Sequence, residues 1–436
     1  VIAPDSASGG EIQLDGAAIS GAGALSGYAA ALDIGTTTLA VRIIDRASGE
    51  TLASASAWNA QAPYGADVIS RIKYASRDGG LARLTELART QARELIAIAC
   101  GDANVAHEEI AEILCAGNTT MEHIFAGVSP ESIGRAPYAP AEYFTDGGAL
   151  AGEAFPNAKI RLVPCVSGYI GGDTVAAVHA TGMAERGGVR LLMDIGTNGE
   201  LVLGGRDGLL SCSVACGPAF EGAEISCGMR SVPGAISRVS FAQGEFWYVV
   251  IGGGYPKGIC GTGIVDALAE MLKSGVIDGT GRLLEPDELP EGLRETVSVN
   301  KKGHLSFTVA PGVKLRAADI RKLQLAKAAV RAGVELLVRR AGVTWDDIDE
   351  VYLAGGFGTR LNIASAAEIG LIPKELAGKT RAIGNAALDG AHRALCSPDG
   401  FERLLDIRSR CEYMELSGSA EFSDAFVDAM AFYEED

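Results

Sequence analysis

The sequence predicts an α/β protein made of two similar lobes, and three observations support this fold class. LDIGTTTLAV at residues 32–41 aligns without a gap with MDIGTNGELV at residues 193–202. The aspartates of the two copies, Asp33 and Asp194, are 194 − 33 = 161 residues apart, which is the size of one domain. A length of 436 residues allows about two or three domains, and 47% hydrophobic with 21% charged residues is typical of a folded chain.

We expect the first lobe over residues 28–185, with strands that alternate with helices. Sequence patterns predict strands at residues 29–34, 38–45, 51–57, 112–116 and 160–163, and helices at about 65–100, from Asn118 or Thr119 through Phe125, and at 171–181. Residues 127–158 are rich in Gly, Pro and Ala, so we expect an irregular segment there. Residues 1–27 are rich in Gly, Ala and Ser and begin without Met, and we interpret them as a linker remnant of a longer protein.

We expect the second lobe over residues 186–436, beginning with the same order of strand, turn and strand as the first. The strands are expected at 189–195 and 200–204, followed by a hairpin near 235–251, a helix at 260–274, a loop and small hairpin at about 278–313, a helix at 317–341, a strand at 350–354, a helix at 384–395 and a terminal helix at 417–432.

The charge and the cysteines restrict the partners and the location. The net charge of 38 − 55 = −17 argues against nucleic acid or an anionic membrane as the main partner, since both would be repelled. No stretch approaches the roughly 18 apolar residues of a membrane span. Nine scattered cysteines without an export signal indicate reduced thiols in a cytoplasm. Cys212, Cys216 and Cys227 lie close in sequence, but their spacing fits neither zinc nor ferredoxin-type clusters, so we interpret them as packing residues rather than redox groups.

The first D-I-G-T copy combines groups that can bind phosphate and magnesium. A strand delivers Asp33, Gly35 permits a tight turn, and three hydroxyl residues follow, namely Thr36, Thr37 and Thr38. Successive backbone N–H groups in such a turn form a concave anion-binding site. A neighbouring carboxylate can hold Mg²⁺ through water. A single copy could be an acidic hairpin turn, but two copies at lobe spacing favour a shared chemical role.

The second copy repeats these groups one lobe later. Asp194 is followed by Gly196, Thr197, Asn198 and Gly199. Neither copy is a Walker A loop, because no Gly-Lys-Ser/Thr follows, and neither is a dinucleotide fingerprint, because a strand and not a helix follows the turn.

Three further glycine-containing segments are candidate ligand contacts. A flat ring could lie against the strand end at Gly355, Gly356 and Phe357, and the helix start at Gly261, Thr262 and Gly263 could face phosphate or ribose. Their alternatives are a plain tight turn and a helix entry capped by Thr262. Asp173 could act on Mg²⁺ or its water, or it could be an N-cap. Gly384–Ala387 and Gly390-Ala391 give a helix a small-residue face that permits a close helix crossing.

Together these segments resemble the actin-like ATPase superfamily of sugar and acetate kinases, heat-shock chaperone ATPases and actin. The resemblance implies two ribonuclease-H-like lobes with a nucleotide cleft between them. Residues 33–38 are similar to the first phosphate motif of that family, residues 194–199 to the second, and residues 353–358 to its adenosine motif. The helices at 171–181 and 384–395 resemble its two connecting segments.

A narrower resemblance is to the C-terminal ATPase domain of the reductive activators of corrinoid proteins. It is carried by GNTTM at 117–121, DIGTNGE at 194–200, GPAFEG at 217–222 and GTGIVD at 261–266. These activators couple ATP to the one-electron reduction of a Co(II) corrinoid protein to Co(I). The resemblance therefore implies ATP and Mg²⁺ as ligands, a corrinoid protein of a methyltransferase system as partner, and a possible homodimer. It implies an iron–sulfur cluster only in a domain missing from this chain.

The resemblance leads to a hypothesis for the mechanism, and two rival functions remain. Asp33 and Asp194 would hold Mg²⁺ through water, and one of them or Asp173 would orient the attacking water. One rival is a small-metabolite kinase on the same fold, which needs an acceptor pocket and a base. The other is a non-catalytic actin-like scaffold, which predicts nucleotide-dependent polymers. Fold alone does not choose among them.

Overall fold

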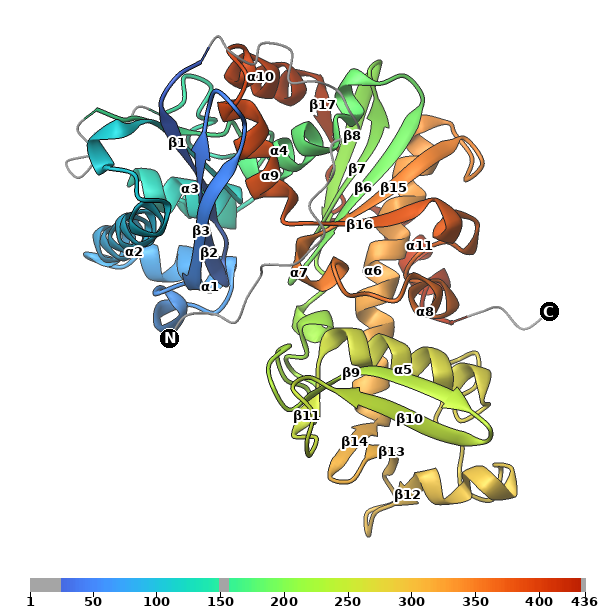
Figure 1. The fold of residues 1–436 in the computed structure, drawn as a ribbon. Helices are drawn as coiled ribbons and strands as arrows, with labels where there is room; N and C mark the ends of the chain where they lie inside the picture. Colours follow the sequence, from blue (N-terminus) through green and yellow to red (C-terminus); the bar gives the residue numbers. More distant parts are fainter. Residues whose placement is uncertain (1–24, 149–156, 433–436) are drawn as a thin grey trace. The chain divides into compact units, whose positions relative to one another are not determined.

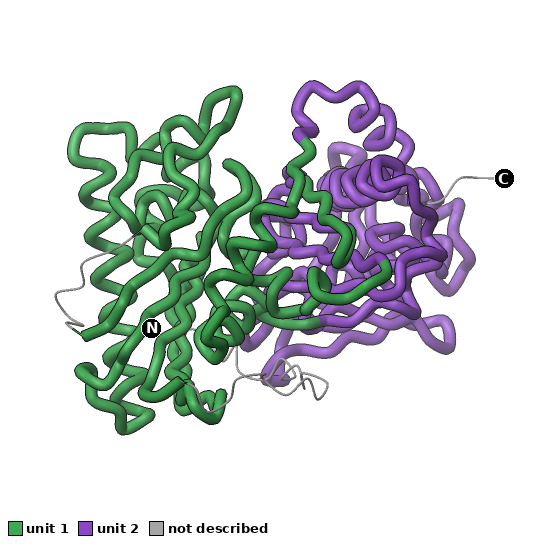
Figure 2. Tube along the Cα trace, turned by 90° about the horizontal axis from the view of Figure 1, so that it is seen from above, with its two compact units in different colours: residues 1–188, 204–212, 383–414 green, residues 189–203, 213–382, 415–436 purple. Residues whose placement is uncertain are grey.

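The computed structural model describes residues 25–148 and 157–432, which form two compact units (Figure 1). Unit 1 comprises residues 1–188, 204–212 and 383–414, and unit 2 comprises residues 189–203, 213–382 and 415–436 (Figure 2). The units are not continuous in sequence, whereas the sequence predicts one boundary near residues 185 and 186. Residues 383–414 belong to unit 1 because a helix from this segment packs against its helices.

Unit 1 is built on a five-stranded sheet with the order β3-β2-β1-β4-β5. Its strands are β1 (Tyr28–Ile34), β2 (Thr38–Asp45), β3 (Thr51–Trp58), β4 (Ile110–Gly117) and β5 (Lys159–Leu162). The first three strands are antiparallel, while β4 pairs in parallel with both β1 and β5. Leu32 and Ile34 of β1 are buried in one core cluster with residues of β2, β4 and the long helix α2.

Helices cover this sheet on both sides. The α-helices of unit 1 are α1 (Val68–Ala75), α2 (Gly80–Ala103), α3 (Thr119–Ala126), α4 (Gly172–Thr181), α9 (Ala386–Leu395) and α10 (Gly400–Arg410). Figure 1 shows α2 on one side of the sheet and α4 with α9 on the other. The small-residue face expected for α9 is confirmed, because a Cβ atom added to Gly390 would lie only 1.8 Å from the carbonyl oxygen of Ala176 in α4.

The second D-I-G-T hairpin lies in a six-stranded sheet with the order β16-β15-β6-β7-β8-β17. Its strands are β6 (Val189–Ile195), β7 (Gly199–Gly205), β8 (Gly208–Val214), β15 (Ile348–Ala354), β16 (Thr380–Gly384) and β17 (Cys411–Tyr413). The predicted repeat is confirmed, since β6 and β7 flank the second motif as β1 and β2 flank the first. β15 pairs in parallel with β6 and places Ala354 beside Asp194.

Unit 2 also contains two small sheets and several helices. The sheet β10-β9-β11 contains β9 (Ala235–Ala242), β10 (Glu245–Val250) and β11 (Gly258–Ile259), and the sheet β12-β13-β14 contains β12 (Val297–Val299), β13 (Leu305–Ala310) and β14 (Val313–Arg316). The helices are α5 (Gly261–Lys273), α6 (Ala317–Ala341), α7 (Gly355–Gly358), α8 (Ile363–Glu368) and α11 (Ala420–Asp428).

Several predicted elements differ from the structure for local reasons. The single helix expected at 65–100 is two helices, because the chain turns at Gly79, whose φ is +68°, and at Gly80, where a Cβ would meet the Tyr74 carbonyl oxygen at 2.0 Å. The hairpin expected within 278–313 has a third strand, and β8 and α10 were not predicted. Over the described part of 127–158, the expected irregular segment is confirmed up to β5, apart from the short 3-10 helix Glu131–Gly134. The linker interpretation falls on residues 1–27, of which 1–24 lie outside the described residues.

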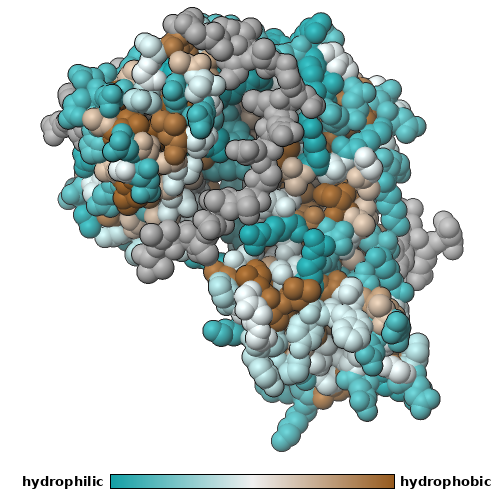
Figure 3. All heavy atoms as spheres, viewed as in Figure 1, coloured by the Kyte–Doolittle hydropathy of each residue, from teal (hydrophilic) through white to brown (hydrophobic). Residues whose placement is uncertain are grey.

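The surface carries both hydrophobic and hydrophilic side chains. Hydrophobic side chains form separate patches among hydrophilic ones on the face drawn in Figure 3. In the described ranges no helix has the length and apolar character needed to cross a membrane.

Candidate functional site

The first D-I-G-T hairpin turns three successive backbone carbonyl groups into unit 1. The Gly35 oxygen accepts a hydrogen bond from Asn59 Nδ2 (2.8 Å), the Thr36 oxygen accepts one from Arg71 Nη2 (2.5 Å), and the Thr37 oxygen accepts one from the Asn59 backbone N–H (2.9 Å). In a trans peptide the carbonyl and the following N–H point in opposite directions. The N–H groups of Thr36 and Thr37 therefore point away from this network.

The outward direction of these N–H groups is compatible with the anion-binding turn that the sequence predicts. Within residues 25–148 and 157–432, no backbone carbonyl accepts a hydrogen bond from the N–H of Thr36 or Thr37. Asn118, the N-cap of α3, also donates from Nδ2 to the Thr36 hydroxyl oxygen at 2.9 Å, which fixes that side chain. Successive unpaired N–H groups in a turn attract phosphate oxygens.

Two predicted carboxyl groups lie near each other in unit 1. Asp33 follows the buried part of β1, and its Oδ2 accepts a hydrogen bond from Asn385 Nδ2 at 2.7 Å. Burial raises the pKa of Asp33 to about 7 against the effect of the Asn385 bond, and the charge of Asp173 raises it further. Burial also raises the pKa of Asp173 to about 6, although its Oδ1 accepts from the Thr174 N–H at 2.7 Å. A divalent cation nearby would offset this repulsion, so the pair fits a role in holding Mg²⁺.

A third carboxyl group, Glu122 of α3, was missed by the sequence analysis. It is 0% exposed, and neither of its carboxylate oxygens makes a hydrogen bond of good geometry among the described residues. Burial and the charge of Asp173 raise its pKa well above the usual range, while the backbone N–H groups of Gly172 and Gly117 act in the opposite direction. A Cβ on Gly172 would lie 2.2 Å from Glu122 Oε1, which explains the glycine at the start of α4. The GNTTM string ends one residue before Glu122.

In unit 2, Asp194 lies directly against the predicted adenosine motif. Gly355 follows β15 with a φ of +85°, a conformation that favours glycine. A Cβ at residue 355 would lie 2.6 Å from Asp194 Oδ1, so no larger residue fits there. The two strand ends therefore bring the second phosphate motif and the adenosine motif together.

The GPAFEG segment at 217–222 connects the predicted motifs of unit 2. Glu221 Oε1 accepts a hydrogen bond from the Thr197 hydroxyl at 3.1 Å. The Phe220 ring stacks on Phe357, with centroids 5.1 Å apart and planes at 28°. A Cβ on Gly261 would lie 1.7 Å from the Phe220 carbonyl oxygen. Glu221 and Phe220 thus contact residues of the predicted site. Sequence reasoning missed them, since it used their string for the resemblance without assigning them a role.

The remaining predicted glycines lie in the second turn, at the start of α5 and at the start of α7. In the second turn, the Gly196 N–H donates to the Asn198 carbonyl oxygen at 2.8 Å, and a Cβ on Gly199 would lie 2.8 Å from Cys216 Sγ. At the start of α5, a Cβ on Gly263 would lie 2.4 Å from the Ile236 carbonyl oxygen. Gly356 is exposed at the start of α7.

Both proposed capping roles are wrong. The N-cap of α4 is Gly171, one residue before the helix begins, and Asp173 accepts from its own neighbour instead. The N-cap of α5 is Cys260, while the Thr262 hydroxyl donates to the Ser237 carbonyl oxygen at 3.1 Å. Of the two residues at which the sequence predicts the start of α3, Asn118 and Thr119, the N-cap is Asn118, whose Oδ1 accepts from the Met121 N–H at 3.0 Å.

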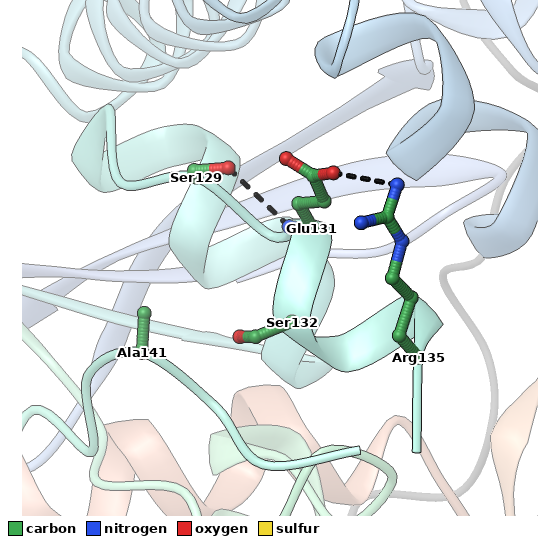
Figure 4. A pocket seen from close by; sticks show the side chains of 5 residues that line it. All are labelled: Ser129, Glu131, Ser132, Arg135 and Ala141. Carbon is green, nitrogen blue, oxygen red and sulfur yellow. Dashed lines mark hydrogen bonds and ion pairs between the residues drawn. The ribbon is translucent and has the colours of Figure 1, made fainter. Parts of the chain in front are cut away.

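Among the described residues, neither a cluster of metal ligands nor the pocket drawn in Figure 4 marks the predicted site. In the described part of the chain, no three or more His, Cys, Asp or Glu side chains are placed to hold a metal ion. An open pocket of about 420 Å³ is lined by Ser129, Glu131, Ser132, Arg135 and Ala141 (Figure 4). It contains none of the predicted site residues. Its Glu131–Arg135 ion pair (2.8 Å) is largely exposed, and such pairs contribute little.

These two groups of residues, each built around a D-I-G-T hairpin at the end of a buried strand, define an actin-like ATPase fold. Comparison with protein families agrees and is more specific. Residues 188–436 match the family described as the C-terminal domain of RACo, the ASKHA domain, and residues 28–186 match the RACo middle region. The chain belongs to the RACo family.

Known relatives include activators and a reductase of corrinoid proteins. The chain is 34% identical over 415 residues to the corrinoid activation enzyme RamQ of Eubacterium limosum, covering 92% of this chain and 69% of the relative. It is 24% identical over 448 residues to the [Co(II) methylated amine-specific corrinoid protein] reductase of Methanosarcina barkeri, covering 93% and 77%. A solved reductive activator for corrinoid, iron–sulfur protein matches with a TM-score of 0.79 and 36% identity, covering 93% of this chain and 66% of that one. This chain therefore spans about two thirds of the solved activator.

Proposed function

We propose that this chain is the ATP-hydrolysing part of an activator that drives the reduction of a corrinoid protein from Co(II) to Co(I). The observation that carries the proposal is the first hairpin, whose N–H groups at Thr36 and Thr37 are free of backbone partners within the described residues and which follows the carboxyl group of Asp33. A turn of this kind binds phosphate oxygens. The printed names of the relatives supply the corrinoid partner.

The residues of the two units would divide the tasks of binding and hydrolysis. We propose that the two D-I-G-T turns bind phosphate oxygens, and that residues 261–263 and 355–357 contact the nucleoside. Asp33 and Asp194 would hold Mg²⁺ through water, and the ion would neutralise charge on the phosphates. One of these two aspartates or Asp173 would orient the attacking water.

The proposal assigns only the ATP-dependent step to these residues. Reduction of the cobalt needs one electron from a donor group, which the resemblance assigns to an iron–sulfur domain outside this sequence. ATP hydrolysis would alter lobe closure and so supply free energy to the partner complex. A homodimer, which the resemblance implies, is proposed with it and is checked by light scattering. We also propose a cytoplasmic location, because the cysteines are odd in number and scattered along the sequence, which is typical of thiols kept reduced.

ATP hydrolysis with and without a Co(II)-state corrinoid protein tests this function. We expect hydrolysis to be stimulated by the Co(II) form and not by the Co(I) or methylated form. ATP consumption that does not depend on the corrinoid protein, but yields a phosphate ester of an added alcohol or acid, would establish a kinase instead. Nucleotide-dependent sedimentation without hydrolysis would establish a scaffold.

A substitution pair localises the activity to the predicted site. Asp33→Ala should abolish hydrolysis and leave the fold intact. Asp102→Ala is the matched control, because Asp102 is an exposed aspartate at the end of α2. Near-normal turnover by the Asp33→Ala protein would overturn the assignment of the first hairpin.

A further inference from the structure

A buried arginine lies behind the first hairpin. Arg71 of α1 is 0% exposed and donates to four acceptors that come from different parts of unit 1. These are the carbonyl oxygens of Thr36 (2.5 Å) and Gly65 (3.0 Å), Gln61 Oε1 (3.2 Å) and Met121 Sδ (3.0 Å). All four acceptors are neutral.

The positive charge of Arg71 is therefore not paired by a hydrogen-bonded carboxylate. Burial lowers its pKa to about 10, and the charge of Asp67 acts to raise it, so the guanidinium group remains protonated at neutral pH. Asp67 accepts from the Ser70 N–H at 2.8 Å as the cap of α1 and does not bond to Arg71. An unpaired buried charge is costly, so its presence calls for a physical reason.

The hydrogen bond to Thr36 gives that reason. The Thr36 carbonyl and the Thr37 N–H belong to one peptide unit, so holding the oxygen inward holds the N–H outward. If this peptide rotated, the carbonyl dipole would face a bound phosphate in place of the N–H. Asn59 holds the peptide units on either side through Gly35 and Thr37. Arg71 is the only residue in the described ranges with a hydrogen bond to the Thr36 oxygen.

We propose that Arg71 is a positioning residue for nucleotide phosphate: it fixes the Thr36–Thr37 peptide with its N–H toward the ligand, and its charge attracts the anion from behind the turn. This inference rests on the proposed function, since it assumes that the turn binds phosphate. A lysine at this position would keep the charge but could not make all of these hydrogen bonds, because Nε, Nη1 and Nη2 each reach an acceptor in a fixed planar arrangement.

Arg71→Met removes both the hydrogen bonds and the charge of Arg71, whereas Arg71→Lys keeps the charge. Arg89→Met is a matched control. Arg89 of α2 is also partly buried in unit 1 and also donates to backbone carbonyls, those of Phe125 (2.7 Å) and Ala126 (3.0 Å), but it does not bond to the hairpin. Loss of Arg89 should lower stability without changing phosphate binding.

The measurement is the Kd of the whole chain for MgATP and for adenosine, which has no phosphate, by competition against a fluorescent nucleotide. We expect Arg71→Met to raise the Kd for MgATP about tenfold to a hundredfold and to leave the Kd for adenosine unchanged. Arg71→Lys should weaken MgATP less, because it keeps the charge. Arg89→Met should change neither Kd.

The outcomes distinguish this inference from the function on which it rests. Equal weakening of MgATP and adenosine by Arg71→Met would show a merely structural role and overturn the inference, as would wild-type affinity for MgATP. If Arg71→Met does not fold, the Arg71→Lys protein decides by the same comparison. A wild-type chain that binds neither ligand would overturn the proposed function itself.

Discussion

The substitution Gly390→Ala tests whether the close crossing of α4 and α9 holds the site of unit 1 in place. A Cβ at residue 390 would lie 1.8 Å from the carbonyl oxygen of Ala176, and Cβ atoms essentially never approach closer than 3.0 Å. The helices would have to separate by about 3.0 − 1.8 = 1.2 Å. The atom in the way is backbone, so no side chain can rotate to make room.

The expected cost follows from this overlap. Overpacking a well-packed core costs about 1–3 kcal/mol, and we expect the upper end because two backbones collide. A loss of about 3 kcal/mol in a unit of this size lowers the melting temperature by about 6–12 °C. The N-cap of α9 is Asn385, whose Nδ2 lies 2.7 Å from Asp33 Oδ2. A shift of about 1.2 Å along this bond would break it, so ATP hydrolysis should fall as well.

Calorimetric melting and hydrolysis rates measure both effects, with Gly101→Ala as the control. Gly101 also lies in a helix, α2, but nothing is within 4 Å of its added Cβ. Alanine there should stabilise the protein by up to about 1 kcal/mol. The two variants make the same chemical change and differ in the available space. If Gly390→Ala has the same melting temperature as Gly101→Ala and hydrolyses ATP at the wild-type rate, the helix crossing does not constrain the site.

The buried charged groups lead to three more expectations. Lys327 Nζ donates to the Ala431 carbonyl oxygen and lies 5.2 Å from the Phe432 ring centre, so Lys327→Met should make the C-terminal segment a faster target for limited proteolysis than in the wild type. Glu122→Gln should raise the free energy of unfolding by about 1–3 kcal/mol at pH 8 and by less at pH 5, because ionising the buried carboxyl group costs free energy. A lower free energy of unfolding at pH 8 than in the wild type would contradict this. Without Mg²⁺, the free energy of unfolding should fall as pH rises from about 4 to about 7, because folded Asp33 keeps its proton to about pH 7 whereas the unfolded chain releases it near 3.8. Asp33→Asn should make the free energy of unfolding less dependent on pH, which thermal melts across this range measure.

The parts of the fold that could be predicted are those that local patterns encode. The two hairpins were predictable because the D-I-G-T repeat is a contiguous string at a fixed position after an apolar strand. The close helix crossing was predictable because small residues at Gly390 and its neighbours leave a bare helix face. The break at Gly79 and Gly80 was missed, because the apolar spacing continues across it and the clash with Tyr74 forms only when the chain turns.

The parts of the site that could not be predicted depend on contacts between distant segments. Arg71 lies in a helix with ordinary amphipathic spacing, and only the folded chain brings it to Thr36, 35 residues earlier. Glu122 is a charged residue of a type usually exposed on helices, but it is completely buried. Thr262 has the sequence position of a cap, but the carbonyl of Ser237 is a nearer partner for its hydroxyl.

Unit 1 concentrates groups of both charges around one hairpin, and neither set is neutralised within it. The carboxyl groups of Asp33, Asp173 and Glu122 have raised pKa values, which means that ionising them costs free energy in the absence of a cation. Arg71 and the outward N–H groups favour an anion at the same turn. Mg·ATP carries both a divalent cation and a polyanion, so one ligand would offset both costs. We therefore expect Mg·ATP to bind more tightly than either free nucleotide or free Mg²⁺, because of the arrangement of the chain's own groups rather than any single strong contact.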